Sequence, residues 1–415
     1  MDVFERLNVG RLMHGVAWVV PLSFFPTLAR ATFLSYFLIF LSERFALSVD
    51  RIGLFVGGFI LLSSVGSLVF GALLDRMSIR TLMLSSSVLQ SAVYAGLLWS
   101  DSLVLVFILC LVLNLAYLSV ETVIRMCIAR WFHSAETASV LSIKYTLTNT
   151  AYALGPLAGL WLSKKGVSPM LFCSAAAIVF ALAAFRPFAD TQEREQPRDK
   201  GEGVLGSLAN MARDRKLLKF TVASVLLAGV FGQFHLYLGQ YLLTTRSIEQ
   251  MYEIINVVFV TNALTSILLQ YPIGRKVTAE RFRLWTCGCV LVFVVGLLGF
   301  AFSSTLFTWA VFTVLFTVGE IIIQPLEFLY ITRIAPARMA GAYYSSQNLT
   351  YLGAASTPVV CGYILVDFSP LYFLLYLLVL LMIGGVIFYN AGGKLASLES
   401  IQPRNSGAVG DQRSI

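Results

Sequence analysis

Residues 71–80 read Gly-Ala-Leu-Leu-Asp-Arg-Met-Ser-Ile-Arg, and they connect an apolar run at 52–74 to another at 81–99. Apolar runs of about 20 residues have the length of a membrane-spanning helix. The chain of 415 residues is 58% hydrophobic and 13% charged, whereas a soluble protein carries about 25% charged residues. This composition excludes a soluble enzyme with a conventional core, a disordered chain and a disulfide scaffold. It also argues against a membrane β-barrel, because barrel strands alternate apolar and polar residues. The sequence therefore predicts an all-α polytopic membrane protein.

Twelve apolar segments can be distinguished, six before and six after a polar stretch at 186–216. Their approximate bounds are 15–41, 52–74, 81–99, 103–127, 139–163, 169–185, 217–243, 251–273, 284–303, 306–332, 341–366 and 371–391. We expect 12 transmembrane helices in two six-helix pseudo-symmetric bundles, and a short amphipathic helix at 204–216 on the membrane surface. The expected N-terminal bundle, cytoplasmic linker, C-terminal bundle and disordered tail occupy 1–186, 187–216, 217–392 and 393–415, respectively.

The distribution of Lys and Arg predicts how the chain crosses the membrane. If the N-terminus lies inside, the cytoplasmic segments hold 23 of the 30 Lys and Arg residues and the outer loops hold 5, with Arg30 and Lys144 inside apolar segments. Because cytoplasmic loops collect positive charge, both termini are predicted to be cytoplasmic, and in a bacterium the membrane is the inner one. The net charge of +8 is thereby explained by topology, so no nucleic-acid partner is expected.

Two local patterns allow other interpretations. A basic N-terminus, an apolar run and Ala-Arg-Ala at 29–31 could form a cleaved signal peptide, but the apolar run continues to Leu41 and cleavage would break the six-plus-six pattern. Cys287 and Cys289 resemble a metal-binding pair only superficially, because they lie near the start of an apolar segment with no His nearby. We expect no metal and no cofactor, and the chain has no phosphate-binding Gly-rich loop for ATP.

The polar turn at 71–80 recurs in the second half as Pro-Ile-Gly-Arg-Lys-Val-Thr-Ala-Glu-Arg at 272–281, an offset of 201 residues. Arg130 closes the fourth segment and Arg333 closes the tenth, an offset of 203. A Pro-containing stretch in the fifth segment recurs in the eleventh at an offset of 202. Two six-helix halves repeated in the same topology, with a polar linker between them, are the plan of an alternating-access transporter.

The motif Gly71-x-x-x-Asp75-Arg76-x-x-x-Arg80 resembles the most characteristic motif of the major facilitator superfamily of transporters, and it stands at the matching place after the second segment. The resemblance implies the major facilitator fold. It also implies that the Gly permits close helix approach, while the Asp and Arg side chains form a charge network that latches the two halves in the outward-open state. Alternatively, Arg76 and Arg80 only anchor the loop at the lipid headgroups.

Gly155, Pro156 and Gly159 in the fifth segment resemble a helix-kink motif of the antiporter branch of the superfamily, which favours export. Pro removes a backbone donor, and small residues let helices pack closely. One departure from the drug antiporters is Asn114, which stands where many of them have Arg in the middle of the fourth segment. Further stretches similar to bacterial multidrug-type drug:proton antiporters are Ala29-Arg30, Gln270–Arg275, Gly319-Glu320, Gln324-Pro325, Arg333–Arg338 and Gly341–Tyr344.

Three ionisable residues lie deep inside apolar segments, where each costs about 2.5–3.5 kcal/mol on insertion. They are Arg30 in the first segment, Glu121 in the fourth and Glu320 near the midplane in the tenth. The resemblance places all three around the central cavity, where a carboxylate could bind the coupling proton or the substrate. Alternatively, Arg30 and a carboxylate form a fixed structural ion pair. Lys144 is expected to snorkel to the cytoplasmic surface, and Glu327 to pair with an interfacial Arg.

The seventh segment concentrates polar side chains. Gln233, Tyr237, Gln240 and Tyr241 follow i, i+4, i+7 and i+8 spacing, so in one continuous helix they share a face that would line the cavity. His235 lies on another face, where it is either a packed helix residue or a proton carrier.

These features predict a secondary active transporter whose two bundles rock about a midplane site. Our hypothesis is proton-coupled efflux of a small amphipathic organic molecule, such as a drug or a siderophore, by a protein that functions as a monomer in the lipid bilayer. The alternative is proton-coupled uptake of a small metabolite. A membrane-embedded enzyme or a receptor fits less well, because the unusual charges sit deep in several helices and the long loop is only a charged linker.

Overall fold

The computed structural model describes residues 20, 23–47, 49–132, 134–189 and 203–399, and these residues form helices without a strand. The helices before the linker are α4 (Phe24–Phe45), α5 (Val49–Leu74), α6 (Ile79–Leu98), α7 (Leu103–Trp131), α8 (Ser134–Lys164) and α9 (Pro169–Ala189). Those after it are α10 (Val204–Arg213), α11 (Arg215–Phe231), α12 (Phe234–Thr245), α13 (Ile248–Gly274), α14 (Phe282–Phe302), α15 (Leu306–Ile334), α16 (Ala340–Ser346), α17 (Thr350–Asp367) and α18 (Pro370–Glu399).

Short polar turns separate the long helices because Ser and Thr cap the helix that follows. Ser78 accepts a hydrogen bond from the Thr81 N–H at 3.0 Å, at the start of α6. Thr305 and Thr308 form a reciprocal capping box at the start of α15. Such caps satisfy backbone N–H groups that have no partner inside the helix, which lets a helix begin directly after a tight turn.

Each of the twelve predicted apolar segments coincides with helix in the described part of the chain. Nine of the described helical stretches are long and apolar enough to cross a membrane, and the pair α11 and α12 would make a tenth if counted as one bent span. The two remaining segments correspond to α8, which is rich in Ser and Thr, and to α9, whose apolar part at Pro169–Ala183 is shorter. Helix α18 continues to Glu399, so the first part of the predicted tail is helical, while 400–415 lie outside the described residues.

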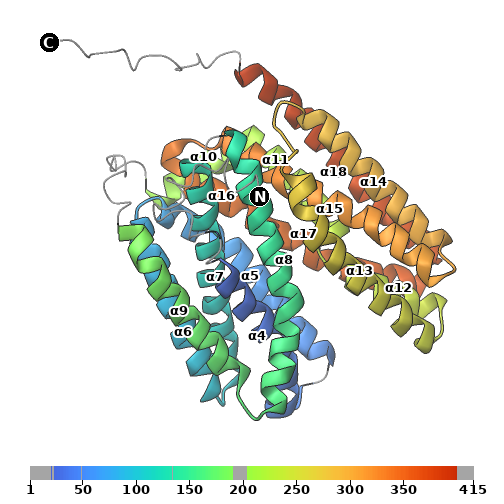
Figure 1. Cartoon of the computed structure of the whole chain (residues 1–415), viewed down its shortest axis with the longest axis horizontal. Helices are drawn as coiled ribbons and strands as arrows, with labels where there is room; N and C mark the ends of the chain where they lie inside the picture. The colour runs from blue at the N-terminus through green and yellow to red at the C-terminus, as the bar shows by residue number, and fades with distance from the viewer. Residues whose placement is uncertain (1–19, 21–22, 48, 133, 190–202, 400–415) are drawn as a thin grey trace.

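The helices of each half pack mainly on one another. Helix α4 contacts α8 and α9 in the first half, and α14 contacts α15 and α18 in the second. The halves meet where α5 contacts α16 and α8 contacts α13. In Figure 1 the two groups of helices diverge with distance from α10 and α16.

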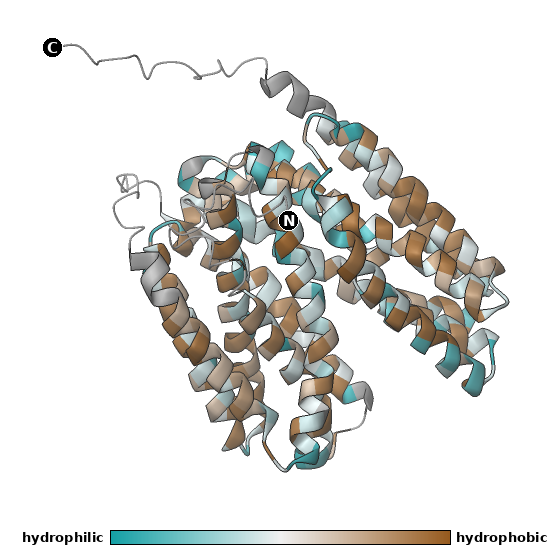
Figure 2. Cartoon of the chain, in the orientation of Figure 1, coloured by the Kyte–Doolittle hydropathy of each residue, from teal (hydrophilic) through white to brown (hydrophobic). Residues whose placement is uncertain are grey.

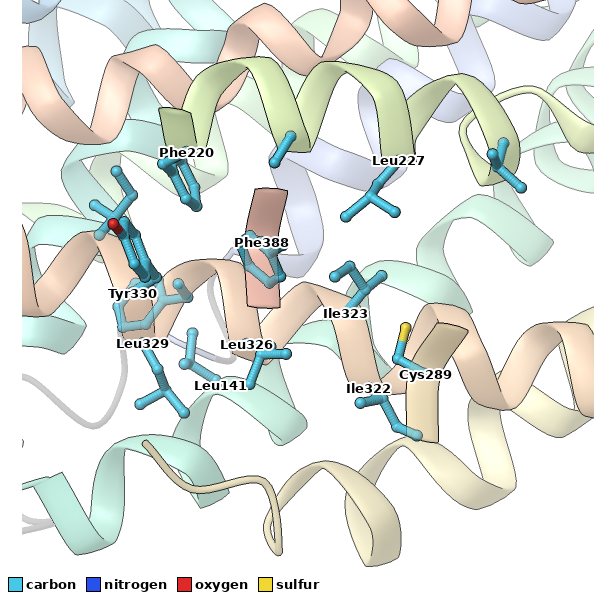
Figure 3. Packing of buried hydrophobic residues seen from close by; sticks show 14 of the residues in the cluster. Leu141, Phe220, Leu227, Cys289, Ile322, Ile323, Leu326, Leu329, Tyr330 and Phe388 are labelled. Carbon is cyan, nitrogen blue, oxygen red and sulfur yellow. The ribbon is translucent and has the colours of Figure 1, made fainter. Parts of the chain in front are cut away.

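The second half has an aromatic core. Phe220 stacks on Tyr330 with ring centroids 5.1 Å apart, and Phe388 lies beside both rings (Figure 3). By contrast, many large apolar side chains are exposed, among them Leu54, Val104 and Leu268. Hydrophobic residues recur along the long helices of both groups (Figure 2). An exposed apolar surface this extensive is what lipid covers in a membrane protein.

Candidate functional site

The loop after α5 joins the two halves through a pair of glycines. A Cβ added to Gly71 would lie 2.8 Å from the Gly341 carbonyl oxygen, and one added to Gly341 would lie 2.7 Å from the Gly71 carbonyl oxygen. Asp75 accepts hydrogen bonds from the N–H groups of Gly341 at 2.6 Å and Ala342 at 3.1 Å. We call the end of the molecule around Gly71, Asp75 and Gly341 the junction end. There the carboxylate of one half binds the N-terminus of helix α16 in the other, where free N–H groups and the helix dipole favour negative charge.

Burial raises the pKa of Asp75 to about 6, although its two backbone N–H donors act in the opposite direction. Of the other two residues of the predicted latch, Arg76 is exposed and Arg80 half-buried. Gly71 and Asp75 contact Gly341 of the other half directly.

A second contact at the junction end repeats the first. Gly274 at the end of α13 packs against the side chain of Ser142 in α8, while Gly71 packs against the side chain of Ser345 in α16. Gly71 and Gly274 lie 203 residues apart, as do Ser142 and Ser345. These two contacts between the halves, α5 with α16 and α8 with α13, are thus related by the internal repeat.

Polar side chains continue the connection from the junction end inward. Asn348 donates to the Ser67 hydroxyl at 3.2 Å, and Asn149 donates to the Gln270 side-chain oxygen at 3.4 Å. The Arg125 guanidinium lies 3.5 Å from the side-chain oxygens of both Gln347 and Asn348. Three of these four contacts, at 3.4–3.5 Å, are longer than a normal hydrogen bond and correspondingly weak.

Glu121 forms a buried ion pair with Lys144, and Arg125 lies 4.0 Å from the same carboxylate oxygen. The prediction that Lys144 snorkels to the surface was wrong, because its side chain is 3% exposed. A signal for this pair exists in the sequence: α7 and α8 are antiparallel neighbours, and Glu121 precedes the turn by as many residues as Lys144 follows it. The two side chains therefore lie at equal depth.

Arg30 makes different contacts from those of the other embedded charges. It is 6% exposed, and its Nη1 donates to the side-chain oxygen of Asn114. The side-chain Nδ2 of Asn114 in turn donates to the Ser63 hydroxyl. The guanidinium carbon of Arg30 lies 4.4 Å from the ring centroid of Tyr117 and 5.9 Å from that of Tyr351 in the other half. Among the described residues Arg30 has no carboxylate partner, so it does not form the structural ion pair that the sequence allowed.

Glu320 accepts a hydrogen bond from the Asn262 side chain at 2.9 Å, and the described residues give it no cationic partner. Glu320 is half-buried, whereas Glu327 is buried, at 7% exposed, and its Oε1 has no hydrogen-bond partner in the described structure. The expected pairing of Glu327 with an interfacial Arg is absent among these residues. Glu320 and Glu327 thus lie in α15 without a salt bridge to any described residue.

The seventh segment is not one helix, because α11 and α12 meet at 46° around Gly232 and Gln233. The hydroxyl of Tyr237 donates across this break to the carbonyl oxygen of Val230. The helical spacing that placed Gln233 on a common face therefore ends at the break, and Gln233 is exposed. Of the remaining predicted residues, Tyr237 is buried, Gln240 is half-buried with an unpaired Oε1, and Tyr241 stacks on Phe373 at 5.2 Å between centroids.

The predicted helix-kink motif lies in α8, which continues through Pro156 as one helix. A Cβ on Gly155 would lie 2.8 Å from the backbone nitrogen of Thr32, and one on Gly159 would lie 3.2 Å from the Thr32 carbonyl oxygen. The motif thus holds α8 directly against α4, the helix that carries Arg30.

Sequence reasoning missed the residues that surround Arg30, namely Ser63, Tyr117 and Tyr351. They come from three different helices, so no spacing in the sequence connects them. No group of three or more His, Cys, Asp or Glu residues that could hold a metal ion occurs among the described residues.

The helices, the lipid-facing apolar surface and the embedded charges define a multi-pass membrane protein of the transporter type. The chain belongs to the Major Facilitator Superfamily, whose sequence profile matches residues 19–358. It is 30% identical to the MFS-type transporter YdeE of Escherichia coli (strain K12) over 345 residues, which is 83% of this chain and 87% of that protein. MFS transporters act on small-molecule substrates within a membrane.

Solved structures share the fold at low sequence identity. A bacterial homologue of the iron transporter ferroportin in its outward-facing state matches with a TM-score of 0.67 and 14% identity, over 92% of this chain and 100% of that one. The transporter FucP in its outward conformation matches with a TM-score of 0.66 and 11% identity, over 92% and 99%.

Proposed function

We propose that this protein is a secondary active transporter that exports a small amphipathic organic molecule in exchange for protons by alternating access. The repeated Gly–Ser contact at the junction end carries this proposal. Because the two contacts are equivalent under the repeat, they can break together when one half rocks against the other. The uncompensated charges of Arg30 and Glu320 lie farther inside, where a substrate and a proton would bind.

The positive charge and the helix arrangement at the junction end support an outward-open state and a cytoplasmic orientation of that end. Positive charge is concentrated in the loops at the junction end, which favours placing this end in the cytoplasm and both termini with it. Helix groups that meet there and diverge away from it (Figure 1) would be open to the outside. In this arrangement α8, α9 and the bent pair α11–α12 complete twelve spans in two six-helix bundles, and the protein works as a monomer in the inner membrane.

Of the two carboxylates considered for proton coupling, Glu320 is the better candidate. The Glu121 carboxylate faces two cations, Lys144 and Arg125, which compete with a proton for it. The Glu320 carboxylate receives only a neutral amide donor from Asn262. A carboxylate inside a membrane-spanning helix without a counter-ion is costly when ionised, so it favours binding a proton and releasing it when water reaches the site.

Transport into inside-out vesicles, with and without an imposed pH gradient, tests the proposal. Export predicts accumulation of a substrate from a panel of amphipathic compounds only when the vesicle lumen is acidic. The Glu320→Gln variant should lose this gradient dependence while still exchanging substrate across the membrane, and Glu253→Gln, in the adjacent α13, is a matched control. Accumulation driven by the opposite gradient would establish uptake instead, and gradient-driven transport by the Glu320 variant would remove Glu320 from coupling.

A further inference from the structure

We propose that Arg30 binds an anionic group of the transported molecule, so that the substrate class is a small amphipathic organic acid, most simply a carboxylate. This inference rests on the proposed transport function and specifies what that function acts on. It concerns the charge of the substrate, and it holds for either direction of transport.

Arg30 is a buried cation whose hydrogen-bonding capacity is only partly used. A guanidinium offers five N–H donors and keeps its charge at all relevant pH values. In the described structure its Nη1 donates to the neutral amide of Asn114, and its Nε is buried without a hydrogen-bond partner. An uncompensated cation this deep in a membrane protein marks an ion or substrate pathway.

The nearby carboxylate of Glu121 does not neutralise Arg30. It is already paired with Lys144, and Arg125 lies next to it. Arg30, Arg125 and Lys144 therefore face one carboxylate in this part of the first half, which leaves an excess of positive charge. An anionic ligand would compensate that excess.

The surroundings of Arg30 fit an organic anion better than a small inorganic one. The rings of Tyr117 and Tyr351 lie against the guanidinium, from α7 and α17 respectively. Aromatic rings supply an apolar wall for a carbon skeleton, while the planar guanidinium can bind a carboxylate through two parallel hydrogen bonds. Because Tyr351 belongs to the other half, a ligand held here would contact both halves, as alternating access requires.

The internal repeat separates this anion site from the proposed proton site. At the offset of 203 residues, Asn114 corresponds to Thr317 and Tyr117 corresponds to Glu320. The first half therefore presents a cation at the level where the second half presents a carboxylate. Substrate and proton can thus bind at equal depth on opposite halves without competing for the same side chain.

Binding to the purified full-length protein tests the inference without requiring transport. The probes are matched pairs of amphipathic carboxylates and their uncharged amides, beginning with 1-naphthoate and 1-naphthamide, and binding is measured by ligand-dependent thermal stabilisation in a chloride-free buffer. We expect at least one carboxylate to bind about tenfold or more tightly than its amide. The Arg30→Gln variant should lose this preference, and Arg30→Lys should keep part of it.

The matched control is Arg44→Gln, which removes a cation from the same helix at an exposed site paired with Asp101 at 2.7 Å. It should keep the carboxylate preference. If Arg30→Gln does not yield a monodisperse protein, Tyr117→Leu provides the second test, because it removes the ring and leaves the charge, and it should weaken the carboxylate and the amide alike.

Three results would overturn the inference: no carboxylate preference in any pair, an unchanged preference in Arg30→Gln, or stabilisation by chloride that no carboxylate displaces. None of these depends on the pH gradient. If gradient-driven export fails while Arg30-dependent binding is intact, the proposed coupling is wrong. The assigned substrate class would still hold.

Discussion

At the scale of single residues, the close packing at the junction end depends on two glycines. Gly71 and Gly341 have no Cβ, and this lets two backbones approach to a distance that any other residue would prevent.

We predict that Gly71→Ala prevents full closure and lowers transport at least tenfold. Gly57→Ala is the matched control in the same helix, because a Cβ there meets nothing within 4 Å and should leave transport unchanged. Transport assays at equal expression compare the two variants. Equal transport rates for Gly71→Ala and Gly57→Ala would show that the close approach is dispensable.

Asp75 makes the junction sensitive to pH. Its pKa is about 6 in the closed junction, and it would return to about 4 when the loop opens to water. Between these values the closed state holds a proton that the open state releases, so closure is favoured as pH falls through this window and weakened as pH rises through about 6.

Alkylation of a cysteine placed at the buried position Ser345 measures this effect, since only an open junction exposes it. Lowering the pH from 7 to 5 should reduce the labelled fraction. In the Asp75→Asn background, only the pH dependence of the thiol itself should remain, so the ratio of the two labelled fractions reports the effect of Asp75. Equal pH dependence in both backgrounds would contradict the assignment.

The pair of Glu121 and Lys144 illustrates the cost of a lone buried charge. Removing one partner of a buried pair typically costs about 3–5 kcal/mol, whereas removing both costs much less. We therefore expect Lys144→Met to lower the melting temperature markedly, and Glu121→Gln together with Lys144→Met to recover most of the loss. A double-mutant cycle in detergent measures this, and additive effects of the two changes would show that the pair contributes nothing.

At the scale of elements, the linker helix is attached to the junction. Helix α10 contacts α5 and α16 as well as α11, and Asp214, directly after it, accepts a 2.6 Å hydrogen bond from the Tyr343 hydroxyl. The sequence predicted the amphipathic helix, but not that it docks on the protein, because this contact joins residues far apart in the chain.

We predict that Tyr343→Phe loosens this attachment without disturbing the core. Hydrogen exchange of α10 should increase, because the lost hydrogen bond to a charged group is typically worth about 1.5–3 kcal/mol. Tyr363→Phe is the control, because Tyr363 is exposed. Unchanged exchange in α10 would mean that the hydroxyl does not hold it.

The elements also show where sequence reasoning stops. Apolar length located the helices, because each must present about 20 apolar residues to lipid. The break between α11 and α12 was not predicted, because glycine is common in membrane helices and Gly232 therefore gives no distinct signal. The Tyr237 hydrogen bond that spans the break is visible only in three dimensions. The partners of Arg30 were missed for the same reason, whereas its depth was clear from the sequence.

At the scale of the whole molecule, alternating access requires that the junction end separate in every cycle, so a covalent link across it should stop transport. Ser67 and Asn348 face each other across the two halves, with 3.2 Å between Oγ and Nδ2. Cysteines at these two positions, in a background without the native cysteines, should form a disulfide on mild oxidation, because both side chains are buried and oriented toward each other. We predict that oxidation abolishes transport and that a reductant restores it, while each single-cysteine variant responds to neither treatment. The link constrains only the junction end and does not touch Arg30, so we expect carboxylate binding to persist in the oxidised protein. Continued transport after complete crosslinking would mean that the two halves do not separate here and that access alternates by another movement.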